Sequence, residues 1–376
     1  MNVVISGIGT AVPAHQCEQE EAGEVAAHYC SATPEQAHML NVLYRMSGVN
    51  TRGSVVLDRA EGALAERQEF FPPFSDEFPH GPTTETRLEC FAEKAGPLAM
   101  SAAKQALERS SVSPKSITHL ITVTCSGFVA PGFDFTLIKG LPLRPDVQRT
   151  QIGFMGCHAA LNALRVARAF VAADPRAVVL VCCVELCTLH YQYGWDPEQI
   201  VANSLFADGA GACVVQADTS PAAGTNGSNH HSRTSTLDRI IDSGSMVLPD
   251  SDDAMTWRVG DHGFRMTLSS RVPGILAEHL RPWMTKWLAT HDLTPEKIVT
   301  WAVHPGGPRI LNAFADAMSI PRDALDISRE IMQTHGNMSS PTVLFVLDRL
   351  RNLGRSGPCV AIGFGPGLVA EATLIG

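Results

Sequence analysis

Three residues far apart in the chain carry the side chains that acyl-transfer chemistry needs: Cys157, His304 and Asn337. A cysteine thiolate is a strong nucleophile, an imidazole can take up its proton, and an amide N–H can stabilise an oxyanion. Each residue alone also has an ordinary structural explanation, because buried cysteines, loop histidines and Gly-Asn turns are common. Their shared setting makes them candidates, since each lies at a predicted strand end or helix start.

The setting of Cys157 is the stretch 151–170, in which a Gly-Phe-Met-Gly turn leads into a segment that is apolar on nearly every face. A helix that is apolar all round is buried. The unpaired N–H groups at its N-terminus favour a thiolate. We therefore expect a lowered thiol pKa at Cys157, with a neighbouring His304 imidazolium adding to the effect.

The second half of the chain repeats this arrangement. His304 follows a predicted strand at 299–303, and Asn337 lies in a turn that leads into an apolar helix at 342–350. Asn337 thus occupies in the second half the place that Cys157 occupies in the first. Two such helices, packed antiparallel between two sheets, would bring the three side chains together.

This repetition predicts a duplicated α/β unit rather than two independent domains. The first half spans 1–218 and carries the cysteine, and the second spans 237–376 and carries the histidine and the asparagine. The segment 219–236 is rich in Ser, Gly, Asn and Ala, which is typical of a flexible connection.

Composition excludes several classes of protein. With 45 % hydrophobic and 18 % charged residues the chain is typical of a globular protein, and a net charge of −9 argues against a nucleic-acid partner. The ten cysteines include no Cys-x-x-Cys pair, so we expect no metal site. Neither a signal peptide nor an apolar run of membrane-spanning length is found, which predicts a cytoplasmic protein.

The order Cys, His, Asn also occurs in papain-like proteases at a similar spacing. The residues around Cys157 are Gly-Cys-His rather than Cys-Gly-Ser-Cys-Trp, and the cysteine lies in mid-chain. A cysteine hydrolase is therefore the weaker hypothesis. A non-catalytic binding module is a further alternative, which the presence of all three polar residues disfavours.

Beyond these three residues, the chain resembles the type III polyketide synthases, the chalcone synthase-like family of the thiolase superfamily. The resemblance covers essentially the whole chain. Two stretches, His-Pro-Gly-Gly-Pro and Gly-Phe-Gly-Pro-Gly, distinguish this family from ketoacyl carrier-protein synthases and from hydroxymethylglutaryl-CoA synthase-like enzymes. The matching motifs are Gly-Cys at 156–157, Leu-Phe-Ala-Asp-Gly-Ala at 205–210, Trp-Ala-Val-His-Pro-Gly-Gly-Pro at 301–308, Gly-Asn-Met-Ser-Ser at 336–340 and Gly-Phe-Gly-Pro-Gly at 363–367.

The resemblance implies a thiolase-like αβαβα fold of five layers, with two mixed sheets around buried central helices. It also implies a homodimer that works without a metal or organic cofactor. Cys157 would carry the starter from an acyl-CoA, while His304 and Asn337 would polarise the thioester of malonyl-CoA. Loss of CO2 leaves an enolate that attacks the acyl group, and repeated rounds end in cyclisation.

The resemblance further implies a set of binding residues. Phe206 matches a gatekeeping phenylalanine, whereas Met266 replaces the second one and alters the starter side of the gate. The implied substrate-binding residues are Phe206, Met266, Cys125, Cys187, Ser339 and Pro366, and the implied CoA contacts are Arg45 and Arg309, with Arg52 as a further candidate.

Small residues at the matched cavity positions indicate a bacterial type of enzyme that takes an aliphatic acyl-CoA. Its expected product is an alkylpyrone or an alkylresorcinol. The alternative is an enzyme primed by malonyl-CoA that makes a tetrahydroxynaphthalene.

Overall fold

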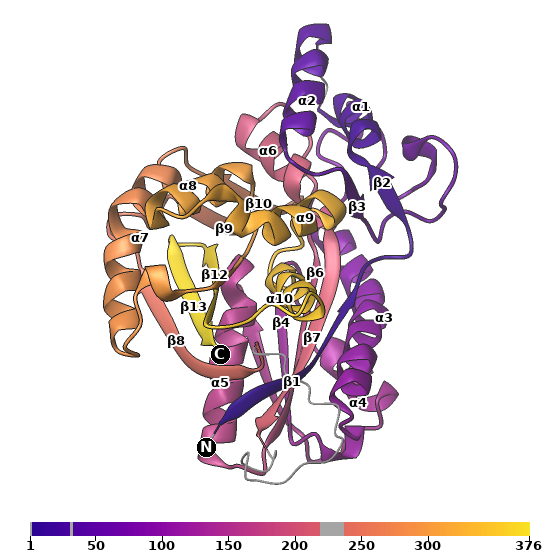
Figure 1. The fold of residues 1–376 in the computed structure, drawn as a ribbon. Helices are drawn as coiled ribbons and strands as arrows, with labels where there is room; N and C mark the ends of the chain where they lie inside the picture. Colours follow the sequence, from indigo (N-terminus) through magenta and orange to yellow (C-terminus); the bar gives the residue numbers. More distant parts are fainter. Residues whose placement is uncertain (1, 31–32, 219–236) are drawn as a thin grey trace, which may run out of the picture.

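The computed structural model describes residues 2–30, 33–218 and 237–376, arranged as shown in Figure 1. The connection predicted at 219–236 lies outside the described residues, so the boundary between the halves stays a prediction. The helices are α1 (Gln19–Tyr29), α2 (Pro34–Met46), α3 (Thr84–Ser110), α4 (Phe133–Gly140), α5 (Ala159–Ala173), α6 (Pro197–Leu205), α7 (Val272–Ala289), α8 (Pro308–Met318), α9 (Asp326–His335) and α10 (Thr342–Asn352). The strands are β1 (Val3–Ala11), β2 (Gln16–Glu18), β3 (Thr51–Gly53), β4 (His119–Thr124), β5 (Gln148–Gly153), β6 (Val178–Leu186), β7 (Asp208–Ala217), β8 (Arg239–Val247), β9 (Met255–Gly260), β10 (Gly263–Leu268), β11 (Thr300–Val303), β12 (Cys359–Gly365) and β13 (Val369–Ile375).

Nine of the described strands form one mixed sheet, which consists of two sets with the same order and the same directions; β2 with β3 and β9 with β10 form two small separate sheets. In the first half the order is β1-β7-β6-β4, followed by the edge strand β5, and in the second half it is β8-β13-β12-β11. In each set the first two pairings are antiparallel and the third is parallel. The sets join at one corner, where Val3 pairs with Ile240 and Val4 with Arg239. The duplication expected from the sequence is therefore present in the fold.

The helices complete five layers. Helix α3 packs on β1, β7 and β6 at the outer face of the first half, and α7 packs on β12 and β13 at the outer face of the second. Helices α5 and α10 share one hydrophobic core and each contacts strands of both halves. Residues 159–164 of α5 are all buried, as the apolar pattern predicts. None of the described helices has the length and apolar character that crossing a membrane requires.

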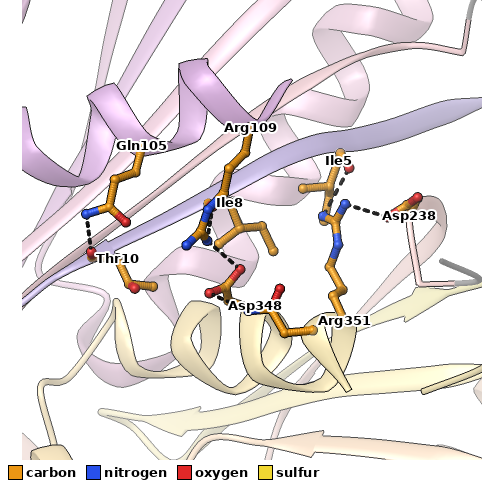
Figure 2. A network of polar contacts seen from close by, with 9 residues as sticks. Ile5, Ile8, Thr10, Gln105, Arg109, Asp238, Asp348 and Arg351 are labelled. Atoms are coloured by element: carbon orange, nitrogen blue, oxygen red, sulfur yellow. Dashed lines mark hydrogen bonds and ion pairs between the residues drawn. The ribbon is translucent and has the colours of Figure 1, made fainter. Parts of the chain in front are cut away.

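Polar side chains fill the seam where the two sets of strands diverge, as Figure 2 shows. Beyond Val4, the edge of β1 that faces β8 has no strand partner, so its carbonyl groups need other donors. From α3, Gln105 donates to the Thr10 carbonyl at 2.9 Å and Arg109 to the Ile8 carbonyl at 2.7 Å. From α10, Arg351 donates to the Ile5 carbonyl at 3.1 Å. These contacts tie the outer helix of one half to the central helix of the other.

Replacing Arg351 by Met should lower the free energy of unfolding by about 2 kcal/mol, because it removes a donor to β1 and a 2.6 Å ion pair with Asp238. Arg176→Met is the control, since this arginine is 90 % exposed and pairs with Asp174 of its own turn. Its loss should cost less than about 0.5 kcal/mol. Urea unfolding followed by circular dichroism measures both variants, and equal losses would contradict the role given to the seam.

Candidate functional site

Cys157, His304 and Asn337 come together where the two halves meet. Cys157 lies in a single 3-10 turn, Gly156–His158, directly before α5. His304 follows β11, and its backbone N–H donates to the Ile362 carbonyl of β12 at 2.8 Å. A methyl group at Gly363 would lie 3.3 Å from the Cβ of His158 and 3.4 Å from the Cβ of His304, so β12 holds the two histidines side by side. The Asn337 amide forms a hydrogen bond with the Cys157 thiol.

The Asn337 side chain has a defined orientation. Its backbone N–H donates to the Leu205 carbonyl and its carbonyl accepts from the Ala207 N–H, both at 2.9 Å. Its side-chain oxygen accepts from the Ser339 N–H at 2.8 Å, which directs the amide NH2 toward Cys157. The preceding Gly336 has φ of +71°, a conformation that favours glycine. The turn therefore presents a fixed N–H donor.

His304 is buried, with 1 % of its surface exposed, and neither ring nitrogen has a hydrogen-bond partner among the described residues. Two buried nitrogens without partners are costly for the folded state, and such groups typically mark functional positions. Burial, with a smaller contribution from the neighbouring His158, lowers the pKa of His304 to about 3. The imidazole is therefore neutral and has both nitrogens free for a reacting group.

The predicted lowering of the Cys157 pKa is wrong for this structure. Burial raises the pKa of the thiol to about 11, and the buried Glu185 carboxylate acts in the same direction. Hydrogen bonds with Ser339 and Asn337 favour the thiolate and offset part of this rise. The neutral His304 supplies no positive charge. Cys157 and His304 are thus poised as a neutral thiol and a neutral imidazole.

Glu185 is a central residue that the sequence reasoning missed. It is fully buried at the end of β6 and accepts hydrogen bonds from the backbone N–H groups of Cys125 and Ser126 and from the Ser126 hydroxyl. The Ser340 hydroxyl, from the second half, donates to it at 2.5 Å. The sequence did contain a signal for this residue, because Glu185 is a charged residue near the end of the apolar run 178–186. Glu185 therefore links the two halves close to Cys157.

The six residues predicted to bind substrate all line one cavity of about 20 Å³, which we call the inner chamber and which contains Cys157. Within it the Cys125 thiol lies 3.3 Å from the Ser339 hydroxyl. The residues that line the chamber are Cys125, Gly156, Cys157, Cys187, Phe206, Met255, Thr256, Trp257, Met266, Ser339 and Pro366.

A larger cavity of about 110 Å³, the side channel, adjoins the inner chamber. The two share Cys187, Phe206, Trp257 and Met266 as walls. The channel extends between α1, α6 and the segment 64–71, and its lining is mainly apolar. Space for a ligand therefore continues well beyond Cys157.

Trp257 is the second functional candidate that the sequence reasoning missed. It lies on β9 opposite Met266 of β10, in a hairpin that the sequence did not predict. Its indole N–H donates to the Cys125 carbonyl at 2.7 Å, and its ring lies 6.2 Å from that of Phe206. Trp257 is thus anchored in the wall between the inner chamber and the side channel.

The three arginines predicted near CoA differ in their surroundings. Arg45 is exposed and pairs with Glu20 at 2.8 Å, and Arg309 is exposed in the first turn of α8. Their elements are neighbours, because a methyl group at Gly48 would lie 2.9 Å from Pro308. Both stay predicted CoA contacts. Arg52 is buried and donates to backbone carbonyl groups, so it is unavailable for a surface phosphate.

Comparisons with known proteins agree along the whole chain. Residues 2–219 match the family model for chalcone and stilbene synthases, N-terminal domain, and residues 240–376 match that for the C-terminal domain. The chain is 30 % identical over 378 residues to the alpha-pyrone synthesis polyketide synthase-like Pks18 of Mycobacterium tuberculosis, covering 99 % of this chain and 90 % of that protein. It is 29 % identical over 374 residues to 1,3,6,8-tetrahydroxynaphthalene synthase of Streptomyces peucetius, covering 99 % and 92 %. The crystal structure of PKS-I from the brown alga Ectocarpus siliculosus superposes with a TM-score of 0.87 at 31 % identity, covering 99 % and 97 %.

Alkylation of Cys157 by iodoacetamide should accelerate with pH across the neutral range. The thiolate is the reacting form. For a thiol whose pKa is raised to about 11, the rate should therefore increase about tenfold for each unit by which the pH rises, as long as the pH stays below that pKa. Peptide mass spectrometry follows Cys157 separately, with the fully buried Cys359 as an internal reference for unfolding. A rate that is already level at neutral pH would show instead that the proton has moved to His304.

Proposed function

The chain belongs to the chalcone and stilbene synthase family, the type III polyketide synthases, and we propose that it extends an aliphatic acyl group on Cys157 with units from malonyl-CoA. Enzymes of this family are acyltransferases that condense malonyl-CoA. The observation that carries the proposal is the buried, unpartnered imidazole of His304, together with the Asn337 amide that is hydrogen-bonded to the Cys157 thiol.

The first step is acylation of Cys157. Its sulfur attacks the carbonyl carbon of the acyl-CoA, and the thiol proton passes to a free nitrogen of the His304 imidazole. The bond to the CoA sulfur breaks, and the leaving thiolate takes that proton. Because both residues start neutral, the transfer separates charge only while the substrate is in place.

The second step is decarboxylation of the malonyl thioester. The bond to its carboxylate breaks, CO2 leaves, and the electron pair forms an enolate whose oxygen accepts hydrogen bonds from His304 and Asn337. Removal of one such donor typically costs about 10² to 10³ in rate. The enolate carbon then attacks the acyl carbon on Cys157 and releases the thiolate, so the chain grows by two carbons. No metal or organic cofactor is needed, because decarboxylation itself supplies the electron pair.

The side channel favours an aliphatic starter. Its walls are mainly apolar, and the polar side chains among them use their donors on other protein groups. The amides of Gln192 and Asn203 donate to the carbonyls of His190 and Gln192, both at 2.8 Å, and Gln199 donates to the carbonyl of Met266 at 2.5 Å. A pocket of this kind binds alkyl groups and offers nothing to polar ones. We therefore propose an alkylpyrone or an alkylresorcinol as product.

The competing product is a tetrahydroxynaphthalene made from malonyl-CoA alone, which the 29 % identity to such a synthase keeps in view. That reaction would leave the side channel without a ligand. We also propose that the enzyme is cytoplasmic, because all ten cysteines are free thiols and disulfides are rare in that compartment.

We further propose that the enzyme is a homodimer. Strand β5 is the outer strand of its half, and unpaired strand edges are usually covered by another chain or element. Beside it lies a group of exposed apolar side chains, which we call the aromatic face and in which the rings of Phe128 and Phe154 are 5.8 Å apart. A two-fold symmetric contact would cover both. The aromatic face consists of Phe128, Val129, Phe135, Phe154 and Met155.

Incubation with malonyl-CoA and a series of acyl-CoA starters from acetyl to lauroyl tests the starter class. Each added methylene that enters the side channel is worth about 0.8 kcal/mol, so kcat/KM should rise about fourfold per methylene until the channel is filled. Val25→Trp, which fills the channel from α1, should lower kcat/KM for lauroyl-CoA and spare acetyl-CoA. Glu24→Trp, on the exposed side of α1, is the matched control, and Cys157→Ala should abolish transfer. A naphthalene polyol formed from malonyl-CoA alone would overturn the aliphatic proposal.

Light scattering coupled to size exclusion tests the dimer. The native chain should elute at twice its 40.4 kDa mass, and Phe154→Glu should shift it toward a single chain by placing a charge on the aromatic face. Val299→Glu, at a residue that is 63 % exposed and outside this face, should leave the mass unchanged. A monomeric native chain, or a dimeric Phe154→Glu variant, would refute this interface.

A further inference from the structure

Arg52 is a buried guanidinium that donates to backbone carbonyls and lies over the Tyr44 ring, 5.6 Å from its centre. It is 6 % exposed, and no carboxylate forms an ion pair with it among the described residues. We propose that Arg52 is a positioning residue: with Asn50 and Thr51 it holds the segment 205–207 and the turn at Asn337 in register, and so sets the place of the Asn337 amide. This inference rests on the proposed function, because it assigns Arg52 to the step in which that amide acts.

The first arm of this contact reaches the end of α6. Nη1 of Arg52 donates to the Asn203 carbonyl at 2.5 Å and to the Phe206 carbonyl at 3.0 Å. Carbonyl groups at a helix C-terminus lack partners within the helix and carry partial negative charge, so a cation there is stabilising. Arg52 therefore fixes the direction in which the chain leaves α6 at Phe206.

The second arm reaches the end of α9, two residues before Asn337. The Thr51 hydroxyl donates to the Thr334 carbonyl at 2.8 Å, and the Asn50 N–H donates to the Gln333 carbonyl at 2.8 Å. Gly336 packs on the Arg52 stem, since a methyl group at this glycine would lie 3.4 Å from the Arg52 Cβ. Residues 50–52 thus hold both segments that border the active site.

Those two segments are bonded to each other at the catalytic asparagine. Phe206 and Asn337 form an isolated parallel bridge through the two backbone hydrogen bonds of 2.9 Å to Leu205 and Ala207. A shift of the Phe206 carbonyl therefore moves the Asn337 backbone, and with it the amide donor. Cys157 belongs to a different element, the turn before α5, and among the described residues no hydrogen bond joins it to residues 50–52.

This difference predicts which step depends on Arg52. Displacement of a transition-state donor lowers kcat for decarboxylation. The attack by Cys157 loses only one of the two hydrogen bonds that favour its thiolate, because the bond with Ser339 remains, so this step is affected less. A planar guanidinium has several donors in a fixed fork, which Lys reproduces only in part. Arg52→Lys should accordingly retain more of the decarboxylation rate than Arg52→Met.

The experiment measures two partial reactions on the full chain. One is acylation of Cys157 by lauroyl-CoA, read as the mass of the intact protein, and the other is conversion of malonyl-CoA alone into acetyl-CoA. Arg52→Met should lower kcat for decarboxylation at least tenfold, with KM for malonyl-CoA and the acylation rate changed by less than about threefold. Thr51→Val, which removes the second arm from a half-buried position, should act in the same direction and more weakly.

Arg281→Met is the matched control, because this arginine also donates to a carbonyl at the end of a helix, that of Met318 in α8. It should leave both partial reactions unchanged, and melting temperatures check that every variant is folded. Equal losses in the two partial reactions of Arg52→Met and Thr51→Val, or no loss in either, would overturn the positioning role. Absence of decarboxylation by the native chain would instead refute the proposed function, so the two failures are distinguishable.

Discussion

The whole site depends on one short backbone contact, the bridge between the segment at Phe206 and the turn at Asn337. It joins a loop of the first half to a turn of the second, and so it fixes the distance between Phe206 and the Asn337 backbone. The side chains reinforce it, with Ser340 bonded to Glu185 and Ser339 beside Cys125. Because the contact is made by the backbone, the side chains remain available for substrate.

Burial explains both the stability of this region and its chemistry. Dry surroundings raise the pKa of the Cys157 thiol and lower that of His304, so neither group is charged before a thioester arrives. The same surroundings strengthen each hydrogen bond to a developing oxyanion. The unpartnered nitrogens of His304 cost stability in the folded chain, a compromise that active sites commonly make.

Buried arginines hold the loops around the site by donating to backbone carbonyls. Arg87, like Arg52, donates to carbonyls: those of Leu189 and Tyr191, each at 2.8 Å. Burial lowers the Arg87 pKa to about 10, which still leaves it cationic near neutral pH. Both arginines fix loops that wall the side channel while spending their donors on the backbone. The loops around the channel are thus held by polar contacts, while the surface that lines the channel is mainly apolar.

The sequence by itself predicted the duplicated halves and proposed Cys157, His304 and Asn337 as reacting residues, because short motifs and apolar helices mark those features locally. The family resemblance supplied the six residues that line the inner chamber. It did not predict the β9–β10 hairpin, whose mixed residues lack a clear alternation, and so it missed Trp257. The thiol pKa was predicted in the wrong direction, since burial and the charge of Glu185 arise only when distant segments pack together. The tertiary structure alone decided the side channel and the contacts of Arg52, because both depend on residues far apart in the chain.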